Sequence, residues 1–96
     1  MSTEARRVHV FLTGRVQGVG FRNFVAANAN KLKLTGWVRN LNDGRVEAVV
    51  EGPAADVASL LKLMERGPSS ARVTDMDIDD EKPTGEFDSF KRKPNA

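Results

Sequence analysis

Apolar and polar residues alternate along residues 6–14, "RRVHVFLTG", which is the two-residue period of a β-strand. Val8, Val10 and Leu12 fall on one face, and His9, Phe11 and Thr13 fall on the other. From Arg22 to about Lys33 the apolar residues recur instead at three- and four-residue spacing, which predicts a helix with one face packed on a sheet. The apolar positions of that helix are Phe21, Phe24, Val25, Ala29 and Leu32.

The second half of the chain continues the same alternation of strands and helices. Residues 35–52 contain two runs rich in β-branched residues, and Asn42-Asp43-Gly44 between them predicts a tight hairpin turn. A helix is expected next, because Pro53 suits a helix start, and Gly67 with Pro68 suits its end. Its apolar stripe comprises Val57, Leu60, Leu61 and Met64. Residues 71–80 alternate again, and residues 87–93 could add a short fifth strand after a polar loop at 81–86.

The predicted order is strand, helix, strand, strand, helix, strand, with a possible fifth strand at the end. This βαββαβ order predicts an α+β, ferredoxin-like sandwich built from split βαβ units, with an antiparallel sheet of four to five strands and two helices on one face. We expect one domain at 6–93, a flexible N-terminus at 1–5 and a C-terminal tail at 94–96. Such a fold hosts enzymes, RNA-binding modules and regulatory modules, so it does not indicate a function by itself.

Composition narrows the function classes. The 96 residues suit a single core, and the absence of cysteine excludes disulfides, thiolate metal sites and a thiol nucleophile. Neither an apolar leader nor an apolar run of about eighteen residues is present, so we expect a soluble cytoplasmic protein without membrane contact. The net charge of +2 is too small to indicate nucleic-acid binding. Residues 1–50 nevertheless hold eight Lys/Arg against three Asp/Glu, which favours an anion site in the first half.

The stretch "TGRVQGVGFRNF", residues 13–24, places three glycines directly before the first helix. It lacks the Gly-Lys-Ser/Thr of a P-loop, and Asn23 occupies the position of the third glycine in a dinucleotide fingerprint. Glycines here would let successive backbone N–H groups converge, and the helix would add its positive dipole end, so the loop could form an anion nest. Arg22 in the first helical turn would supply a five-donor guanidinium for phosphate oxygens. From these residues alone, an anion site and a plain strand-to-helix turn both remain open.

An acidic segment near the C-terminus imitates a calcium loop. Asp75, Asp77, Asp79 and Glu86 fall at its positions 1, 3, 5 and 12, but the obligatory glycine at position 6 is Asp80. The alternation of apolar residues through this segment favours a solvated strand face, and we expect no metal.

Three further features have structural interpretations. His9, the single histidine, has no partner at a catalytic motif spacing, so we expect a structural or surface role. Trp37 is expected to pack in the core or at an edge, because no RNA-type aromatic signature accompanies it. Lys91 to Lys93 are expected to be charges that screen an edge strand.

Two separated stretches, "GRVQGVGFR" at 14–22 and "GWVRNLNDGRVE" at 36–47, resemble the acylphosphatase family, and the resemblance runs from about Arg7 to Arg92. It implies metal-independent hydrolysis of the carboxyl-phosphate bond of a small-molecule acyl phosphate, with no cofactor. Arg22 would hold the phosphate and Asn40 would position the attacking water. The backbone N–H groups that would join Arg22 are those of Gln17, Gly18, Val19 and Gly20.

Inorganic phosphate is then expected as both product and competitive inhibitor. We expect no nucleic-acid or membrane partner, and we expect a monomer. The resemblance also leaves three points open. Lys33 stands where many members have a glycine, so either Lys33 is left-handed or the first helix ends differently. Glycine itself is variable at position 20 in the family, and Arg15 could attract anions at long range.

A second hypothesis is a non-catalytic ferredoxin-like binding module for RNA or a regulatory ligand. An RNA reader should carry aromatic and basic side chains on its exposed sheet face, whereas this sequence concentrates donors in one loop. A module of larger maturation proteins is a third hypothesis, and we expect an independent 96-residue protein instead.

Overall fold

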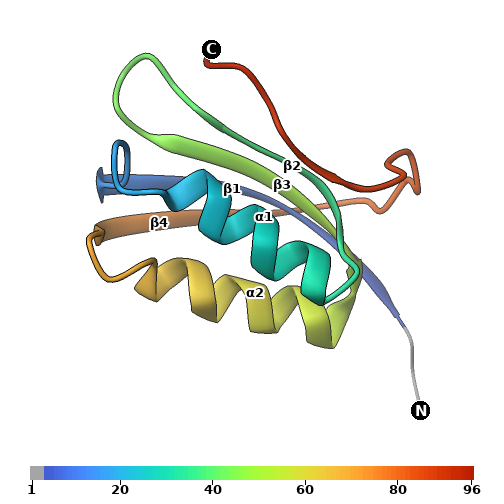
Figure 1. Ribbon diagram of the computed structural model, residues 1–96. Coiled ribbons are helices and arrows are strands. Elements are labelled where there is room, and N and C mark those ends of the chain that lie inside the picture. The colour runs from blue at the N-terminus through green and yellow to red at the C-terminus, as the bar shows by residue number, and fades with distance from the viewer. Residues whose placement is uncertain (1–3) are drawn as a thin grey trace.

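The computed structural model describes residues 4–96 and contains five strands and two helices in the predicted order (Figure 1). The elements are β1 (Ala5–Arg15), α1 (Phe21–Lys31), β2 (Thr35–Asn40), β3 (Val46–Pro53), α2 (Ala54–Arg66), β4 (Arg72–Glu81) and β5 (Phe90–Arg92). Both helices lie on the same face of the sheet, which confirms the ferredoxin-like α+β fold.

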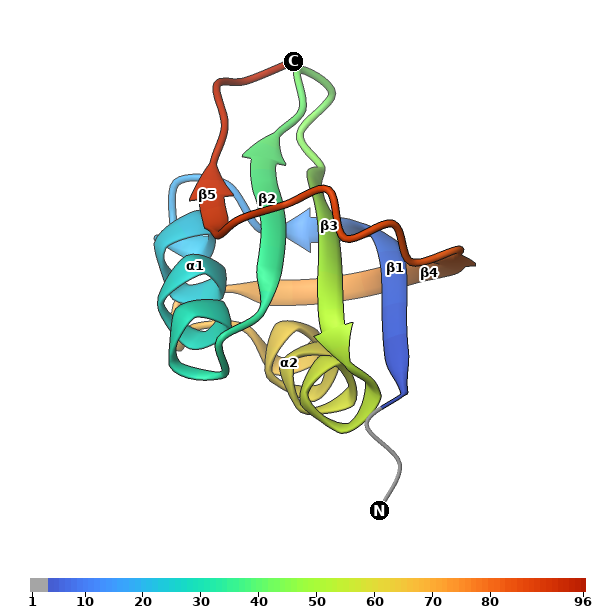
Figure 2. The same cartoon turned by 90° about the vertical axis from the view of Figure 1, so that its right-hand side faces the viewer.

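The strand order across the sheet is β4-β1-β3-β2-β5. The first four strands pair antiparallel, as expected, but β5 runs parallel to β2, so the five-stranded sheet is mixed. The reason is the route of residues 82–89, which leave β4 at one edge and cross the sheet to reach β2 near the other (Figure 2). Because the segment arrives at the end where β2 begins, β5 enters in the same direction as β2.

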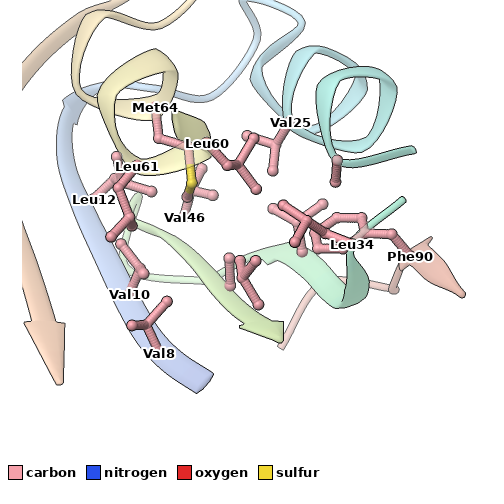
Figure 3. Packing of buried hydrophobic residues seen from close by; sticks show 14 of the residues in the cluster. Val8, Val10, Leu12, Val25, Leu34, Val46, Leu60, Leu61, Met64 and Phe90 are labelled. Carbon is pink, nitrogen blue, oxygen red and sulfur yellow. The ribbon is translucent and has the colours of Figure 1, made fainter. Parts of the chain in front are cut away.

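The core lies between the sheet and the two helices (Figure 3). Val8, Val10 and Leu12 are fully buried on the predicted face of β1. The buried residues of α2 are Val57, Leu60, Leu61 and Met64, the predicted stripe. Each such aliphatic side chain contributes about 1.5–3 kcal/mol when removed from water, so this shared apolar layer fixes both helices on the sheet.

Helix α1 ends in a Schellman motif at the position where a glycine is missing. The N–H of Leu34 donates to the carbonyl of Ala29 at 2.9 Å, and the N–H of Lys33 donates to that of Asn30 at 3.1 Å. Lys33 itself has φ 58, the left-handed conformation that glycine usually supplies. The sequence left two alternatives, a left-handed Lys33 or a different helix end, and the structure has the left-handed Lys33.

Backbone hydrogen bonds attach the described ends of the chain to the sheet. The carbonyl of Glu4 accepts from the N–H of Ala54 at 2.9 Å, just before β1 begins at Ala5. Within the expected flexible segment 1–5, residues 1–3 lie outside the described residues. In the tail, the N–H of Ala96 donates to the carbonyl of Asn40 at 3.1 Å. Across residues 4–96, helix length and hydropathy fall short of what a membrane span requires.

Candidate active site

The glycine loop between β1 and α1 presents a row of unpaired backbone donors. Gly18 and Gly20 have φ 73 and φ 77, left-handed values that an L side chain adopts only with strain. Within residues 4–96, the N–H groups of residues 17–20 donate to no other group. Gly20 then begins α1 as its N-cap, without a side-chain cap and with no acidic residue in the first turn. The donors of the loop and of the helix start are thus free to bind an anion.

A cavity of about 110 Å³ lies against this loop. It is lined by the loop glycines Gly18 and Gly20, by Arg22 of α1, and by Asn40 at the end of β2. The two side chains predicted from separate motifs, eighteen positions apart in the sequence, therefore meet at one cavity. Gln17 and Val19 belong to the same loop but do not line the cavity with the other predicted residues.

Arg22 and Asn40 both leave their polar groups available. Arg22 is half-buried and forms no ion pair within residues 4–96. Asn40 is only 9% exposed, because β3 and the C-terminal tail flank its backbone. Its side-chain amide makes no hydrogen bond to any described residue, so one donor group and one acceptor group face the cavity unused. An amide in this state can both donate to and accept from a bound water.

The side chain of Gln17 has a role that the sequence did not indicate. Its Nε2 donates to the carbonyl of Leu41 at 2.7 Å and to the carbonyl of Arg45 at 2.9 Å. Both carbonyls belong to the turn that joins β2 to β3, directly after Asn40. Gln17 therefore fixes the glycine loop against the strand end that carries Asn40.

Two further residues at the cavity were missed. Arg92 of β5 and Asn23 of α1 also line it, and Nη1 of Arg92 donates to Oδ1 of Asn23 at 2.7 Å. The sequence contained a signal for Arg92, because successive residues of a strand point to opposite faces of the sheet. Arg92 should therefore lie on the face opposite to Lys91 and Lys93. The interpretation of residues 91–93 as screening charges of an edge strand does not cover this contact of Arg92.

The sheet face away from the helices carries His9 in a network of charges. Nε2 of His9 lies 2.6 Å from Oε2 of Glu47, and Nε of Arg39 donates to the other oxygen of Glu47 at 2.7 Å. Burial would raise the pKa of Glu47, but the hydrogen bonds from His9 and Arg39 outweigh it and hold that pKa below its ordinary range. The cavity lining does not include His9, which instead contacts Glu47, Glu81 and the ring of Phe11.

Aromatic rings share this open sheet face, and cations of the same chain cover them. The guanidinium of Arg39 and the ammonium of Lys93 lie 4.8 and 4.6 Å from the ring centre of Trp37. Arg45 lies in the same way over Phe11. Trp37 thus packs on the open face of β2, between β3 and β5, and lies neither in the core nor on an edge strand, the two placements predicted for it.

The acidic residues that imitate a calcium loop lie along a strand. Asp75, Asp77 and Asp79 are alternate residues of β4, paired in register with Thr13, Phe11 and His9. An extended strand spreads these carboxylates along its length, as the alternation had predicted, where a calcium loop would fold them around one point.

Comparison with known proteins gives consistent matches over most of the chain. The family model described as Acylphosphatase matches residues 8–92. A protein of Methylococcus capsulatus named acylphosphatase is 55% identical over 85 residues, covering 88% of this chain and 92% of that protein. The crystal structure of acylphosphatase from Bacillus subtilis has a TM-score of 0.88 and 38% identity, covering 92% of this chain and 98% of that one. The structure of an acylphosphatase from Coxiella burnetii has a TM-score of 0.86 and 34% identity, covering 93% of each chain.

Proposed function

Since the chain belongs to the acylphosphatase family and is an acylphosphatase, we propose that Arg22 and the loop at 17–20 bind the phosphate of its substrate and that Asn40 orients the attacking water. The observation that supports this assignment is the cavity itself. It joins unpaired backbone donors, a guanidinium without a carboxylate partner and an amide without a hydrogen bond. Within residues 4–96 each of these groups lacks a partner. The backbone donors and the guanidinium suit phosphate oxygens, and the amide suits a water molecule.

The phosphate would be held by paired charge-assisted hydrogen bonds. The planar guanidinium of Arg22 can donate two parallel bonds to phosphate oxygens, and the loop N–H groups supply further donors. Together they reduce the repulsion between the phosphate oxygens and an approaching water lone pair. Since neither left-handed glycine has a side chain over the cavity, the phosphate can approach the backbone closely.

The reaction needs orientation more than it needs a strong base. Asn40 would accept a hydrogen bond from the water, or donate one to it, and aim a lone pair in line with the leaving oxygen. A bond forms between the water oxygen and phosphorus while the bond from phosphorus to the acyl oxygen breaks. The acyl group leaves as a carboxylate, and the proton of the water passes to the phosphate product.

Several finer statements are part of the same proposal. Inorganic phosphate would bind the same loop and act as product and competitive inhibitor. We also propose that residues 6–93 form the folding unit, and that the protein works as a cytoplasmic monomer without metal or cofactor. Size-exclusion chromatography tests the monomer, and activity that survives a chelator tests the metal-independence.

The two side-chain roles are tested with benzoyl phosphate as substrate. Asn40→Ala should fold normally and lose roughly 100-fold or more in kcat, as expected when a group that positions the transition state is removed. Asn42→Ala, in the neighbouring turn, is the matched control and should keep its activity. Turnover of Asn40→Ala at the control level would remove Asn40 from the mechanism.

Arg22→Lys keeps the charge but loses the paired geometry. We expect lower activity together with weaker inhibition by inorganic phosphate. Arg66→Lys, at the end of α2, is the control for an arginine distant from the loop in sequence. Unchanged phosphate inhibition in Arg22→Lys would count against Arg22 as the phosphate ligand.

A further inference from the structure

Two arginines from opposite ends of the sequence line the same cavity. Arg22 comes from α1 and Arg92 from β5, and the cavity lining contains no Asp or Glu. Within residues 4–96 neither guanidinium forms an ion pair. Of the seven other arginines, four pair with carboxylates, namely Arg6, Arg7, Arg39 and Arg45, and three outside the cavity do not, namely Arg15, Arg66 and Arg72. The cavity therefore holds two positive charges that the chain itself does not neutralise.

Arg92 is oriented without losing its charge. Within residues 4–96 its guanidinium makes one hydrogen bond, from Nη1 to Oδ1 of Asn23 at 2.7 Å, and this bond uses a neutral acceptor. The other N–H groups of the guanidinium remain free for a ligand. A carboxylate in place of Asn23 would have held Arg92 equally well but would have cancelled the field it projects into the cavity.

The sheet register places Arg92 on the side of the sheet where the cavity lies. Arg92 pairs with Val38 of β2, whose side chain is fully buried under the helices. Asn40 follows two residues later on the same strand, so its side chain lies on that side as well. The neighbouring Lys91 pairs with Trp37 and so lies on the opposite face.

This inference rests on the proposed function, in which the loop at 17–20 and Arg22 hold the phosphate. The second guanidinium then remains for the other part of the substrate, the acyl group. We propose that Arg92 is a specificity-determining residue that binds an anionic group on the acyl moiety. This chain accordingly prefers acyl phosphates that carry a carboxylate or a second phosphate on the acyl part to those whose acyl part is neutral.

The test compares two substrates of one shape. In 4-carboxybenzoyl phosphate the acyl group carries a carboxylate, and in its methyl ester the same position is neutral; the 3-carboxy isomer and its ester test a second direction. Comparing the ratio of kcat/KM values between variants cancels the intrinsic reactivity of each substrate. Arg92→Gln should lower the preference for the carboxylate roughly three- to tenfold, the range for an exposed but geometrically held ion pair.

Matched variants separate a local contact from a general charge effect. Lys91→Gln removes the same charge from the adjacent residue of β5 and should change the ratio less than about twofold, because that charge faces the other side and is screened by solvent. Asn23→Ala keeps the charge of Arg92 but removes the hydrogen bond that orients it. This variant should therefore lose part of the preference for the carboxylate substrate. Urea unfolding of each variant establishes that the proteins compared are equally folded.

The outcomes distinguish this inference from the proposed function. An unchanged ratio in Arg92→Gln overturns the specificity role. An equal loss on both substrates with weaker inhibition by inorganic phosphate assigns Arg92 to the phosphate, which overturns the inference and leaves the proposed function standing. Failure of the wild-type protein to hydrolyse either substrate would overturn the proposed function, and the inference with it.

Discussion

The side chain of Gln17 connects stability to catalysis, so replacing it tests both. In Gln17→Met the volume and the flexible stem are kept, while the two hydrogen bonds to the carbonyls of Leu41 and Arg45 are lost. Each bond contributes about 0.5–1.5 kcal/mol net. Neither carbonyl is left unsatisfied, because Gly44 still donates to Leu41 and the N–H of Leu41 still donates to Arg45. We therefore expect the free energy of unfolding to fall by about 1–2 kcal/mol, the lower part of the summed range.

That loss is measurable by urea or thermal unfolding followed by the fluorescence of Trp37, the only tryptophan. For a domain of this size, 1 kcal/mol corresponds to roughly 4–8 °C in Tm. We also expect kcat on benzoyl phosphate to fall about tenfold or more, because the loop would no longer be fixed relative to Asn40. Ser59→Ala, which removes one exposed helix hydrogen bond, is the control and should stay within about 0.5 kcal/mol of wild type.

Gln17→Glu sharpens the same test. A carboxylate cannot donate, and it would face two carbonyl oxygens, so this variant should be less stable than Gln17→Met at neutral pH. If both variants unfold within about 0.5 kcal/mol of wild type, the account of the hydrogen bonds is refuted. If stability falls as expected but kcat does not, Gln17 contributes to folding and the positioning argument is wrong.

Three other variants probe backbone conformation and charge. Gly18→Ala should lose about 1–2 kcal/mol of stability from its left-handed backbone, since the added Cβ meets nothing within 4 Å, and should also lose activity. Gly85→Ala, with φ 70 and equal space, is its match; loss of activity there too would remove the special status of the glycine loop. Lys33→Gly should gain about 0.5–1 kcal/mol in urea unfolding, because relief of the left-handed strain exceeds the added chain entropy; a destabilised variant would contradict the Schellman geometry. Glu47→Gln should cost about 1–2 kcal/mol at pH 7. Because the pKa of Glu47 is depressed on folding, its stabilisation is present above the ordinary pKa of 4.5 and is lost as pH falls through the folded pKa, so the difference from wild type should narrow in that window. A difference that stays constant with pH would refute the charge pairing.

Sequence patterns were sufficient for the parts of the fold that local chemistry determines. The alternation around His9 predicted which face of β1 is buried, and Asp43-Gly44 predicted the hairpin. The direction of β5 was not predictable in this way, because pairing with β2 depends on the path of residues 82–89 across the sheet. The hydrophobic period within a single strand or helix carries no information about that path.

The residues of the site likewise divide into those that local sequence could indicate and those that depend on contacts between distant segments. Arg22 and the glycine loop are adjacent in sequence, so helix and turn chemistry could suggest an anion site there, although the residues alone left a plain turn equally open. Asn40 required the family resemblance. Asn23 and Arg92 are 69 positions apart, and their hydrogen bond exists only because β5 lies beside α1. The side-chain bonds of Gln17 were likewise beyond reach, because their acceptors are backbone carbonyls that carry no sequence signal.

The RNA-binding hypothesis cannot be judged from the positions of the aromatic and basic residues alone, because their contacts decide whether the rings are available. Aromatic and basic residues do share the open sheet face, which by location alone would favour a nucleic-acid surface. The ring of Trp37 is occupied by Arg39 and Lys93, and the ring of Phe11 by Arg45. A base would have to displace these cations before it could stack.

The edge strand β4 affects whether a strand of another molecule can pair with this sheet. Five of its ten residues are acidic, namely Asp75, Asp77, Asp79, Asp80 and Glu81. Asp80 and Glu81 pair with Arg6 and Arg7, whereas Asp75, Asp77 and Asp79 form no ion pair within residues 4–96. An edge strand offers unpaired N–H and C=O groups to any strand of another chain, and these three carboxylates would repel a second copy of the same strand. The other edge, β5, is three residues long and is followed by Pro94, which has no N–H to offer. Both edges of the sheet thus carry features that disfavour the addition of a strand from another molecule.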